Sequence, residues 1–303
     1  MHGRTCRTLL PNDRVAAQVS KEEGFEMAIS ASMVKELRER TGAGMMECKK
    51  ALVETDGDMD AAIDFLRKSG QAKADKKASR VAADGRIVIA VEGKRAAMVE
   101  INSETDFVAK GDNFGAFAEA VASRVLASAA EDMHALMAEA VVEGDSRTIE
   151  AARTELVAKV GENISVRRFA TMEAIDFLGS YTHGARIGAL VSLRGGNSEL
   201  ARDVAMHVAA SNPAYLDEAS VPDAALERER QIYTEQARKS GKPADIVAKM
   251  VAGRLKKHLS EITLLGQPFV KDPELAVGRL LQNAAAEVPE FLRFEVGEGI
   301  EKK

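Results

Sequence analysis

The chain has few of the residues that stabilise folds through disulfide bonds or bound metal ions. Its 303 residues include two cysteines, Cys6 and Cys48, and no tryptophan. Two cysteines cannot form a disulfide framework, and neither has the Cys-x-x-Cys or paired-His spacing of a zinc site. This usage is typical of a reducing compartment, so we expect a cytoplasmic protein.

Long apolar runs are also missing. The stretch from Ile187 to Leu193 is among the longest, and it is far shorter than a membrane-spanning helix, so it predicts a buried strand. We expect neither secretion nor membrane insertion.

The chain lacks an excess of basic residues. It has 42 Lys and Arg against 47 Asp and Glu, which gives a net charge of -5 and an isoelectric point near 5.7. Proteins that bind chiefly to nucleic-acid phosphates usually show the opposite balance. We therefore expect no direct contact with nucleic acid. The length and the hydrophobic content of 46% suit two or more globular domains.

Motifs of common catalytic sites are missing as well. Gly241-Lys242 is followed by Pro243 and lacks the glycine spacing and the following Ser or Thr of a phosphate-binding loop. There is no HExxH or GxSxG motif, and the five histidines are scattered. Glu104 and Asp106 could act as an acid–base pair, but exposed acids in a loop are ordinarily just solvated. We expect no catalytic residue, no metal site and no cofactor, so the chain is not expected to be an enzyme.

The first 26 residues differ from the rest. They contain arginines early and glutamates late, with no sustained periodicity, and the glutamates argue against a mitochondrial transit peptide. Codons for Lys21-Glu22-Glu23 can form a purine run that resembles a bacterial ribosome-binding site, a short spacer before Met27. We expect the natural start at Met27 and a non-native or disordered extension over residues 1–26.

Residues 27–80 predict three short helices followed by a linker. Ser30 or Ser32 caps the first helix, which ends at Thr41-Gly42. The second ends at Thr55-Asp56-Gly57. Asp58 caps the third, and Gly70 follows its end. Lys73 to Arg80 predicts a solvated linker.

The loop Gly42-Ala43-Gly44 leads into Met45 and Met46. The two side chains either close the core of the helical bundle or contact an apolar surface of a partner, since thioethers on a Gly-rich turn suit both roles. The bundle is similar to a ubiquitin-associated domain.

A β hairpin is predicted next. Arg86 to Glu92 and Ala96 to Ile101 flank a turn at Glu92-Gly93-Lys94. The polar stretch Asn102 to Lys110 then predicts a loop before an Ala-rich helix. Phe107 lies in this loop, and the local pattern favours a ring that folds back as a hydrophobic staple on that helix, with Asp112 or Asn113 as its cap.

From Ala83 onward the sequence predicts the same arrangement twice, with a small sheet covered by antiparallel helices in each half. This is an α+β arrangement. The first copy comprises the hairpin, the Phe107 loop, helices at 113–129 and 148–160, and a strand at 164–172. The second copy comprises a strand at 186–194, helices at 198–210 and 274–286, and a strand at 291–296.

The second copy is interrupted by a predicted helical hairpin. Residues 240–243 turn the chain, and Val247, Val251, Leu255 and Leu259 form an i, i+4 stripe on the returning arm. Arms of about sixteen residues would be roughly 24 Å long. We expect a projecting antiparallel coiled coil that serves dimerisation or partner binding.

The chain is therefore expected to divide into five parts. These are residues 1–26 as an extension, 27–80 as the helical domain and linker, 81–176 as core subdomain N, 177–221 with 266–303 as core subdomain C, and 222–265 as the inserted coiled-coil hairpin.

Three strings resemble one known family. They are Thr105-Asp106-Phe107-Val108-Ala109-Lys110, the stretch from Arg38 to Met46, and Tyr181-Thr182-His183-Gly184-Ala185-Arg186. They are similar to bacterial translation elongation factor Ts, the guanine nucleotide exchange factor for elongation factor Tu, and the likeness runs from about Met27 to the C-terminus. The resemblance implies a pseudo-repeated core and an exchange factor without catalytic chemistry of its own.

The resemblance also implies residues that contact the GTPase. A first group reaches into the GTPase and disturbs its Mg²⁺ site: Thr105, Asp106, Phe107 and Val108. A second group meets a helix of the GTPase domain: Arg38, Met45 and Met46. A third group supplies secondary contacts near the Phe107 loop: Val160, Gly161 and His183. By itself, His183 in a polar turn between strands would be a solvated side chain, and His207 lies on a helix face that predicts core or subunit packing.

The partner implied by the resemblance is elongation factor Tu, with a homodimer or a 2:2 complex possible through the hairpin at 222–265. Some relatives continue into a further helix that touches the GTPase, whereas this sequence stops at Lys303. An alternative is a ribosome-associated binding module without exchange activity. That alternative would use the N-terminal bundle but leaves Phe107 and the hairpin without a role.

Overall fold

The computed structural model describes residues 29–239, 241 and 243–301. The extension predicted at 1–26 and two residues of the predicted hairpin turn, Ser240 and Lys242, lie outside these ranges. The chain divides into two compact units, Met1–Ser69 and Gly70–Lys303. The finer division into five parts stays a prediction.

The first unit contains three helices, α1 (Ala31–Thr41), α2 (Met45–Glu54) and the first part of α3 (Met59–Lys77). Ser30 caps α1, and Gly42 ends it in the left-handed region at φ 67°. Asp58 Oδ1 accepts hydrogen bonds from the first amides of α3. The predicted caps of α1 and α3 and the predicted end of α1 are confirmed, whereas the likeness to a ubiquitin-associated domain stays a prediction.

Gly70 does not end the third helix, contrary to the prediction. It is buried within α3, and a Cβ there would lie 3.7 Å from Ala158 Cβ and 3.9 Å from Thr154 Cγ2. Gly70 therefore lies where α3 packs on α7 (Ile149–Val160). Buried Ala74 one turn later joins the same core, so the expected linker is helical as far as Lys77.

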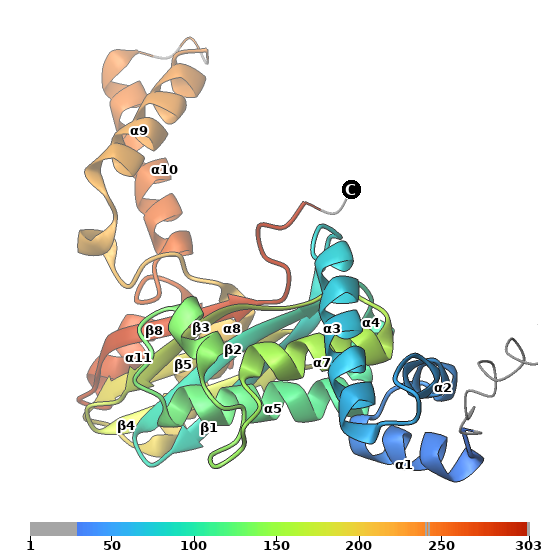
Figure 1. Cartoon of the computed structure of the whole chain (residues 1–303). Helices are drawn as coiled ribbons and strands as arrows, with labels where there is room; N and C mark the ends of the chain where they lie inside the picture. The colour runs from blue at the N-terminus through green and yellow to red at the C-terminus, as the bar shows by residue number, and fades with distance from the viewer. Residues whose placement is uncertain (1–28, 240, 242, 302–303) are drawn as a thin grey trace, which may run out of the picture. The chain divides into compact units, whose positions relative to one another are not determined.

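The second unit contains two three-stranded antiparallel sheets (Figure 1). In each, a hairpin is joined by a third strand that returns after intervening helices and pairs with the second strand of the hairpin. Sheet 1 consists of β1 (Asp84–Glu92), β2 (Arg95–Ser103) and β3 (Ile164–Glu173). Sheet 2 consists of β4 (Phe177–His183), β5 (Ile187–Arg194) and β8 (Glu287–Glu295). The predicted α+β class is confirmed.

The sheets pack on each other, and helices cover their outer faces. Sheet 1 packs on α5 (Asp112–Ala127) and α7, and sheet 2 on α8 (Ser198–Ser211) and α11 (Val277–Asn283). On β2, Val99 contacts the helices, while its neighbour Met98 meets Leu190 of β5 between the sheets. A Cβ on Gly188 would lie 2.5 Å from Ile87 Cγ2, so glycine permits this close approach. Both central strands are thus buried on two faces.

Several elements differ from those predicted. β4 and the short elements α6 (Met133–Ala138) and β6 (Pro268–Phe269) were not predicted. The helix predicted over 274–286 begins instead as a strand, β7 (Asp272–Ala276), and the following α11 ends at Asn283. The chain there is held by pairing of β6 with β7 and by a bond of 3.0 Å from Val277 N to Gln267 O.

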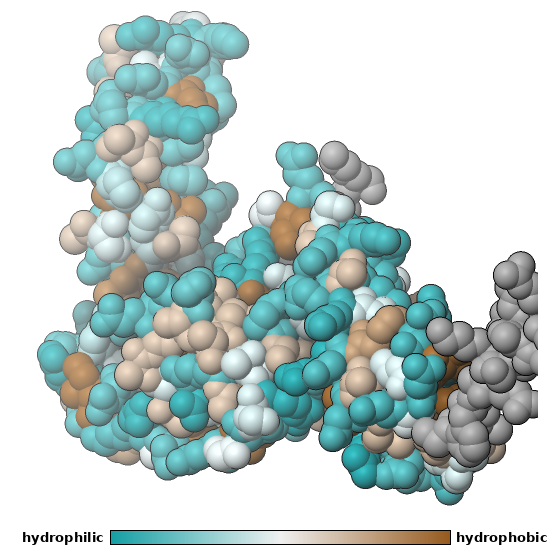
Figure 2. Space-filling model, in the orientation of Figure 1, coloured by the Kyte–Doolittle hydropathy of each residue, from teal (hydrophilic) through white to brown (hydrophobic). Residues whose placement is uncertain are grey.

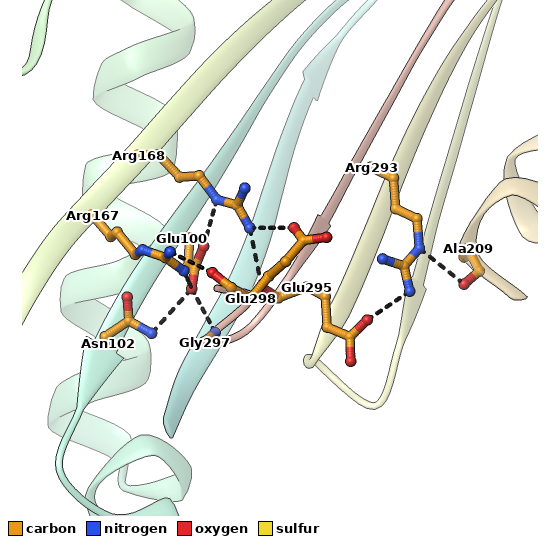
Figure 3. A network of polar contacts seen from close by, with 9 residues as sticks. All are labelled: Glu100, Asn102, Arg167, Arg168, Ala209, Arg293, Glu295, Gly297 and Glu298. Carbon is orange, nitrogen blue, oxygen red and sulfur yellow. Dashed lines mark hydrogen bonds and ion pairs between the residues drawn. The ribbon is translucent and has the colours of Figure 1, made fainter. Parts of the chain in front are cut away.

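A buried carboxylate lies between the sheets (Figure 3). Glu100 of β2 is fully buried and accepts hydrogen bonds from Arg167 at 2.9 Å, Arg168 at 2.5 Å and Asn102 at 3.1 Å. The N–H of Gly297, just after β8, donates to the same carboxylate at 2.8 Å. Burial would raise the pKa of Glu100, but these hydrogen bonds outweigh it and hold the pKa below its ordinary value.

The second half buries a neutral pair instead. His207 of α8 has no exposed surface, and its Nδ1 accepts from Val270 N at 3.2 Å. Its Nε2 therefore carries the proton and donates to Gln267 Oε1 at 3.0 Å. Burial lowers the pKa of His207 against the opposing effect of Gln267. Gln267 also donates to the carbonyls of Ser211 and Glu261.

Two antiparallel helices, α9 (Asp223–Arg238) and α10 (Ala244–Ile262), form the hairpin that rises from the second unit in Figure 1. Ala237, Val247 and Val251 pack between them. The base is joined to the core by backbone hydrogen bonds such as Leu264 N to Tyr215 O at 2.8 Å. Much of the surface of the hairpin is hydrophilic in Figure 2. The term coiled coil stays a prediction. Among the described residues, no helix combines the length and apolarity needed to cross a membrane.

Candidate partner-binding site

The segment around Phe107 is a short helix rather than the predicted loop. After β2 ends at Ser103, α4 (Asp106–Lys110) forms a single turn capped by Thr105, whose Oγ1 accepts from Val108 N at 3.4 Å. Ala109 is buried and Val108 packs partly on the core, whereas the Phe107 side chain is 83% exposed. The helix thus has an apolar inner face and carries an aromatic ring on its outer face.

The predicted hydrophobic staple is wrong. Phe107 does not fold back, because Phe114 and Phe117 already fill the core beneath α5. The N-cap of α5 is Gly111, which makes no side-chain cap bond, so neither Asp112 nor Asn113 has the expected capping role. In the described ranges, no other phenylalanine is exposed. A large apolar ring in water is a feature of partner-binding surfaces.

Asp106 is a surface carboxylate next to this ring. Its Oδ2 accepts from Lys110 Nζ at 2.6 Å, one helical turn away. This hydrogen bond, helped by the positive charge of Lys110, lowers the pKa of Asp106 below its ordinary value. Asp106 is therefore ionised at neutral pH. Because exposed ion pairs contribute little free energy, the pair with Lys110 can be exchanged for contacts with a partner.

The start of α4 is joined to the turn that follows α7. Thr105 donates through Oγ1 to Glu162 Oε1 at 2.7 Å and through its backbone N–H to Glu162 Oε2 at 3.0 Å. In the opposite direction, Asn163 N donates to Glu104 Oε1 at 2.7 Å. The structure therefore brings the turn at Val160 and Gly161 next to the Phe107 helix.

The same turn is fixed by the end of α3. Gly161 adopts φ 81° and ends α7, in agreement with the helix predicted over 148–160. Its carbonyl accepts a hydrogen bond from Lys77 Nζ. The side chain of Asn163 donates to Arg80 O at 2.8 Å, and Arg80 forms an ion pair with Glu104 at 3.4 Å. Three segments distant in sequence thus meet beside α4.

His183 is the last residue of β4, and the turn itself is made by Gly184 and Ala185, both at positive φ. The His183 side chain is exposed, and its Nδ1 lies 3.4 Å from Tyr181 Oη. Ala185 O accepts from Ile87 N at 2.8 Å. Since β1 begins at Asp84 and pairs there with Ser103, this turn lies at the end of the sheet from which α4 continues.

The remaining predicted contact residues belong to the first unit. Met45 and Met46 begin α2 and are 53% and 76% exposed. The interpretation that both close the bundle core is therefore wrong, since buried residues such as Leu37 and Leu52 fill it. Arg38 is exposed in the last turn of α1. All three side chains are free to contact another protein.

Features of an enzyme site are not concentrated here. Among the described residues, no group of three or more His, Cys, Asp or Glu side chains is placed to hold a metal ion. A cavity of about 220 Å³ between β4, α8 and the β6–β7 turn is lined partly by Asp203 and Lys271, which pair at 2.5 Å. The exposed ring on an ordered helix around Phe107 suits binding of a partner.

Comparison with known proteins identifies the family. The family described as Elongation factor TS matches residues 104–298. An elongation factor Ts of Thioalkalivibrio sulfidiphilus is 60% identical over 281 residues, which cover 91% of this chain and 95% of the relative. The chain belongs to the elongation factor Ts family. Elongation factors Ts of Halorhodospira halophila and Methylococcus capsulatus are 58% and 57% identical, with the same coverage.

Family membership identifies a translation elongation factor and confirms the resemblance given by the three strings. It does not by itself assign the contact residues. Glu162 and Glu104, which hold the start of α4, were not predicted from the sequence as site residues. The only local signal is a polar pair, Glu162-Asn163, directly after the glycine that ends a helix.

Proposed function

We propose that this elongation factor Ts acts as a guanine nucleotide exchange factor. It binds elongation factor Tu in its GDP form, displaces Mg²⁺ and promotes release of GDP so that GTP can bind. It supplies no catalytic chemistry and works in the cytoplasm. The observation that carries the proposal is the Phe107 ring, which is 83% exposed on a helix held by hydrogen bonds at its start.

The free energy required is modest. A factor accelerates release when it stabilises the nucleotide-free GTPase more than the GDP-bound form, and by linkage GDP then weakens binding of the factor equally. A thousandfold weakening of GDP binding needs about 4 kcal/mol. Burial of one phenylalanine side chain contributes about 1.5–3 kcal/mol, so the Phe107 ring provides a large part of it.

GTPases hold GDP through a phosphate loop and a bound Mg²⁺. Phe107 inserts between helices of the GTPase domain, and ionised Asp106 exchanges Lys110 for groups near the Mg²⁺ site. Thr105 and Val108 complete this contact, while Val160, Gly161 and His183 lie at its edge.

Arg38, Met45 and Met46 contact a different helix of the GTPase domain, in keeping with the predicted similarity of the first unit to a ubiquitin-associated domain. The second half of the core and the hairpin hold the remaining domains of elongation factor Tu. The hairpin is a coiled coil that can also join two copies into a homodimer or a 2:2 complex. Ile232 and Ile246 expose 37% and 41% of their surface for such a contact.

The test is release of fluorescent GDP from elongation factor Tu. The wild-type protein is expected to accelerate release, and Phe107→Ala to reduce kcat/KM for exchange about tenfold to a hundredfold, which corresponds to the lost burial. Val142→Ala is a matched control, because it removes another apolar side chain that is 54% exposed, near the start of α7.

Three outcomes separate the hypotheses. Failure of the wild-type protein to accelerate release removes the exchange function. Equal activity of wild type and Phe107→Ala removes the role of the ring. Co-sedimentation with ribosomes in the absence of elongation factor Tu, without exchange activity, would instead support a ribosome-associated module.

A further inference from the structure

The helix that carries Phe107 is too short to keep its shape alone. Five residues make little more than one turn, and the first turn of an isolated helix is unfavourable because several backbone angles are fixed for one hydrogen bond. Val108 and Ala109 attach its inner face to the core. The orientation of Phe107 therefore depends on what holds the N-terminal end of α4.

We propose that Glu162 is the positioning residue that fixes α4 so that Phe107 is presented to the GTPase in one orientation. This inference rests on the proposed exchange function. Both carboxylate oxygens of Glu162 are used, one for the hydroxyl and one for the backbone N–H of Thr105, at 2.7 and 3.0 Å. Charge-assisted hydrogen bonds of this kind are stronger than neutral ones.

The bond from Thr105 to Glu162 also orders the cap of α4. Because the Thr105 hydroxyl donates its hydrogen bond to Glu162, a lone pair of Oγ1 remains to accept from the N–H of Val108, at 3.4 Å. The hydrogen bonds thus run from the carboxylate through the threonine into the helix. Val108 directly follows Phe107 in the chain, so this order fixes the backbone from which the Phe107 side chain projects.

Glu162 can act as a fixed point because its own backbone is held on both sides. Gly161 accepts from Lys77, and Asn163 donates through its backbone to Glu104 and through its side chain to Arg80 O. Truncation of Glu162 leaves all of these bonds in place. It therefore releases the start of α4 without removing the turn.

Glu162→Ala is expected to lower kcat/KM for GDP exchange about tenfold, mostly through KM, because α4 must then be ordered at the moment of binding. A matched control is Glu139→Ala. Glu139 is also half-buried and accepts two side-chain hydrogen bonds, from Arg124 at 2.5 Å and Ser128 at 2.6 Å, away from α4. It is expected to leave exchange unchanged.

A double-mutant cycle separates positioning from a direct contact. If Glu162 acts through Phe107, Glu162→Ala has little further effect on exchange in the Phe107→Ala background. The same tenfold loss in both backgrounds would show that Glu162 acts independently of the ring, and the inference would be overturned.

Amide hydrogen exchange of the protein alone gives a readout that does not need the GTPase. Glu162→Ala is expected to accelerate amide hydrogen exchange at Val108 and Ala109 at least tenfold, while the hydrogen-exchange rates of α5 and α7 stay unchanged. Unchanged protection of α4 would contradict the inference even if the wild type is an active exchange factor. If Glu162→Ala loses protection of α4 but the wild-type protein does not accelerate GDP release, the proposed function is refuted. The role assigned to the orientation of Phe107 falls with it, while the anchoring of α4 by Glu162 stands.

Discussion

The two halves of the second unit share one strand order but bury different polar groups. The first half holds an ionised carboxylate, Glu100, whose partners come from β2, β3 and Gly297, two residues after β8. The second half holds neutral His207 and Gln267, which connect α8 to the base of the helical hairpin. A buried charge needs several donors, and here it obtains them across both sheets, whereas the neutral pair is satisfied within one half.

The largest effect is expected when the first half loses its buried carboxylate. Glu100→Ala leaves Arg167 and Arg168 without their buried partner and removes the acceptor of Gly297 N. We expect a loss of about 3 kcal/mol in the free energy of unfolding, measured by urea denaturation. Glu139→Ala, which also breaks an arginine pair but at a more exposed site, should cost about 1 kcal/mol or less. Equal losses for the two variants would refute the special role of Glu100.

The helices also approach the two sheets differently. In the second half, the glycine at the contact between helix and sheet is Gly179 of β4. A Cβ on Gly179 would lie 2.0 Å from the backbone oxygen of Ala201 in α8. In the first half, the corresponding glycine is Gly115 of α5. A Cβ on Gly115 would meet only the guanidinium group of Arg86, at 2.9 Å from Nη1.

Gly179→Ala is therefore expected to destabilise the protein by about 1–3 kcal/mol, because backbone must move. Gly115→Ala should be neutral or stabilise by up to about 1 kcal/mol, because the arginine tip can shift and alanine favours a helix. Thermal unfolding of the two variants tests this contrast. A larger loss of stability for Gly115→Ala than for Gly179→Ala would contradict the prediction.

A smaller effect on stability is expected when the pH is lowered. The pKa of His207 is lowered from its ordinary 6.5, so the fold favours neutral imidazole, and its stabilisation is lost as pH falls below 6.5. The pKa of Glu100 is lowered from 4.5, so its stabilisation is present above 4.5 and is lost only at more acidic pH.

Between pH 7 and 5, stability should therefore decline through His207, by at most about 1.4 kcal/mol per pH unit. His207→Gln is expected to be less stable at pH 7 but to show a flatter dependence over this range in urea denaturation. An unchanged slope would mean that His207 is not the group responsible.

Local signals predicted much of the fold. The capping of α1 by Ser30 and Gly42, and the turn between β1 and β2, depend on neighbouring residues and were confirmed. Gly70 was misinterpreted because a glycine that ends a helix and one that admits a packed neighbour look the same in sequence. Residues 274–276 form a strand because pairing with β6 and the bond from Val277 N to Gln267 O override their helical composition.

The candidate site shows the same limit. Family resemblance pointed to Phe107, whereas the local pattern favoured a staple, because it cannot show that Phe114 and Phe117 already occupy the core. Glu162 is 57 residues from Thr105 in the chain, so no local pattern links them. Positioning contacts of this kind become visible only when the topology is known.

The late return of β8 has a consequence for synthesis. β5 ends at Arg194 and its partner strand begins at Glu287, so β5 has an open edge while the helical hairpin is being translated. At usual translation rates this interval lasts roughly 5–20 seconds. During that time the edge of β5 that later pairs with β8 lies open in the nascent chain, and an unpaired strand edge favours aggregation.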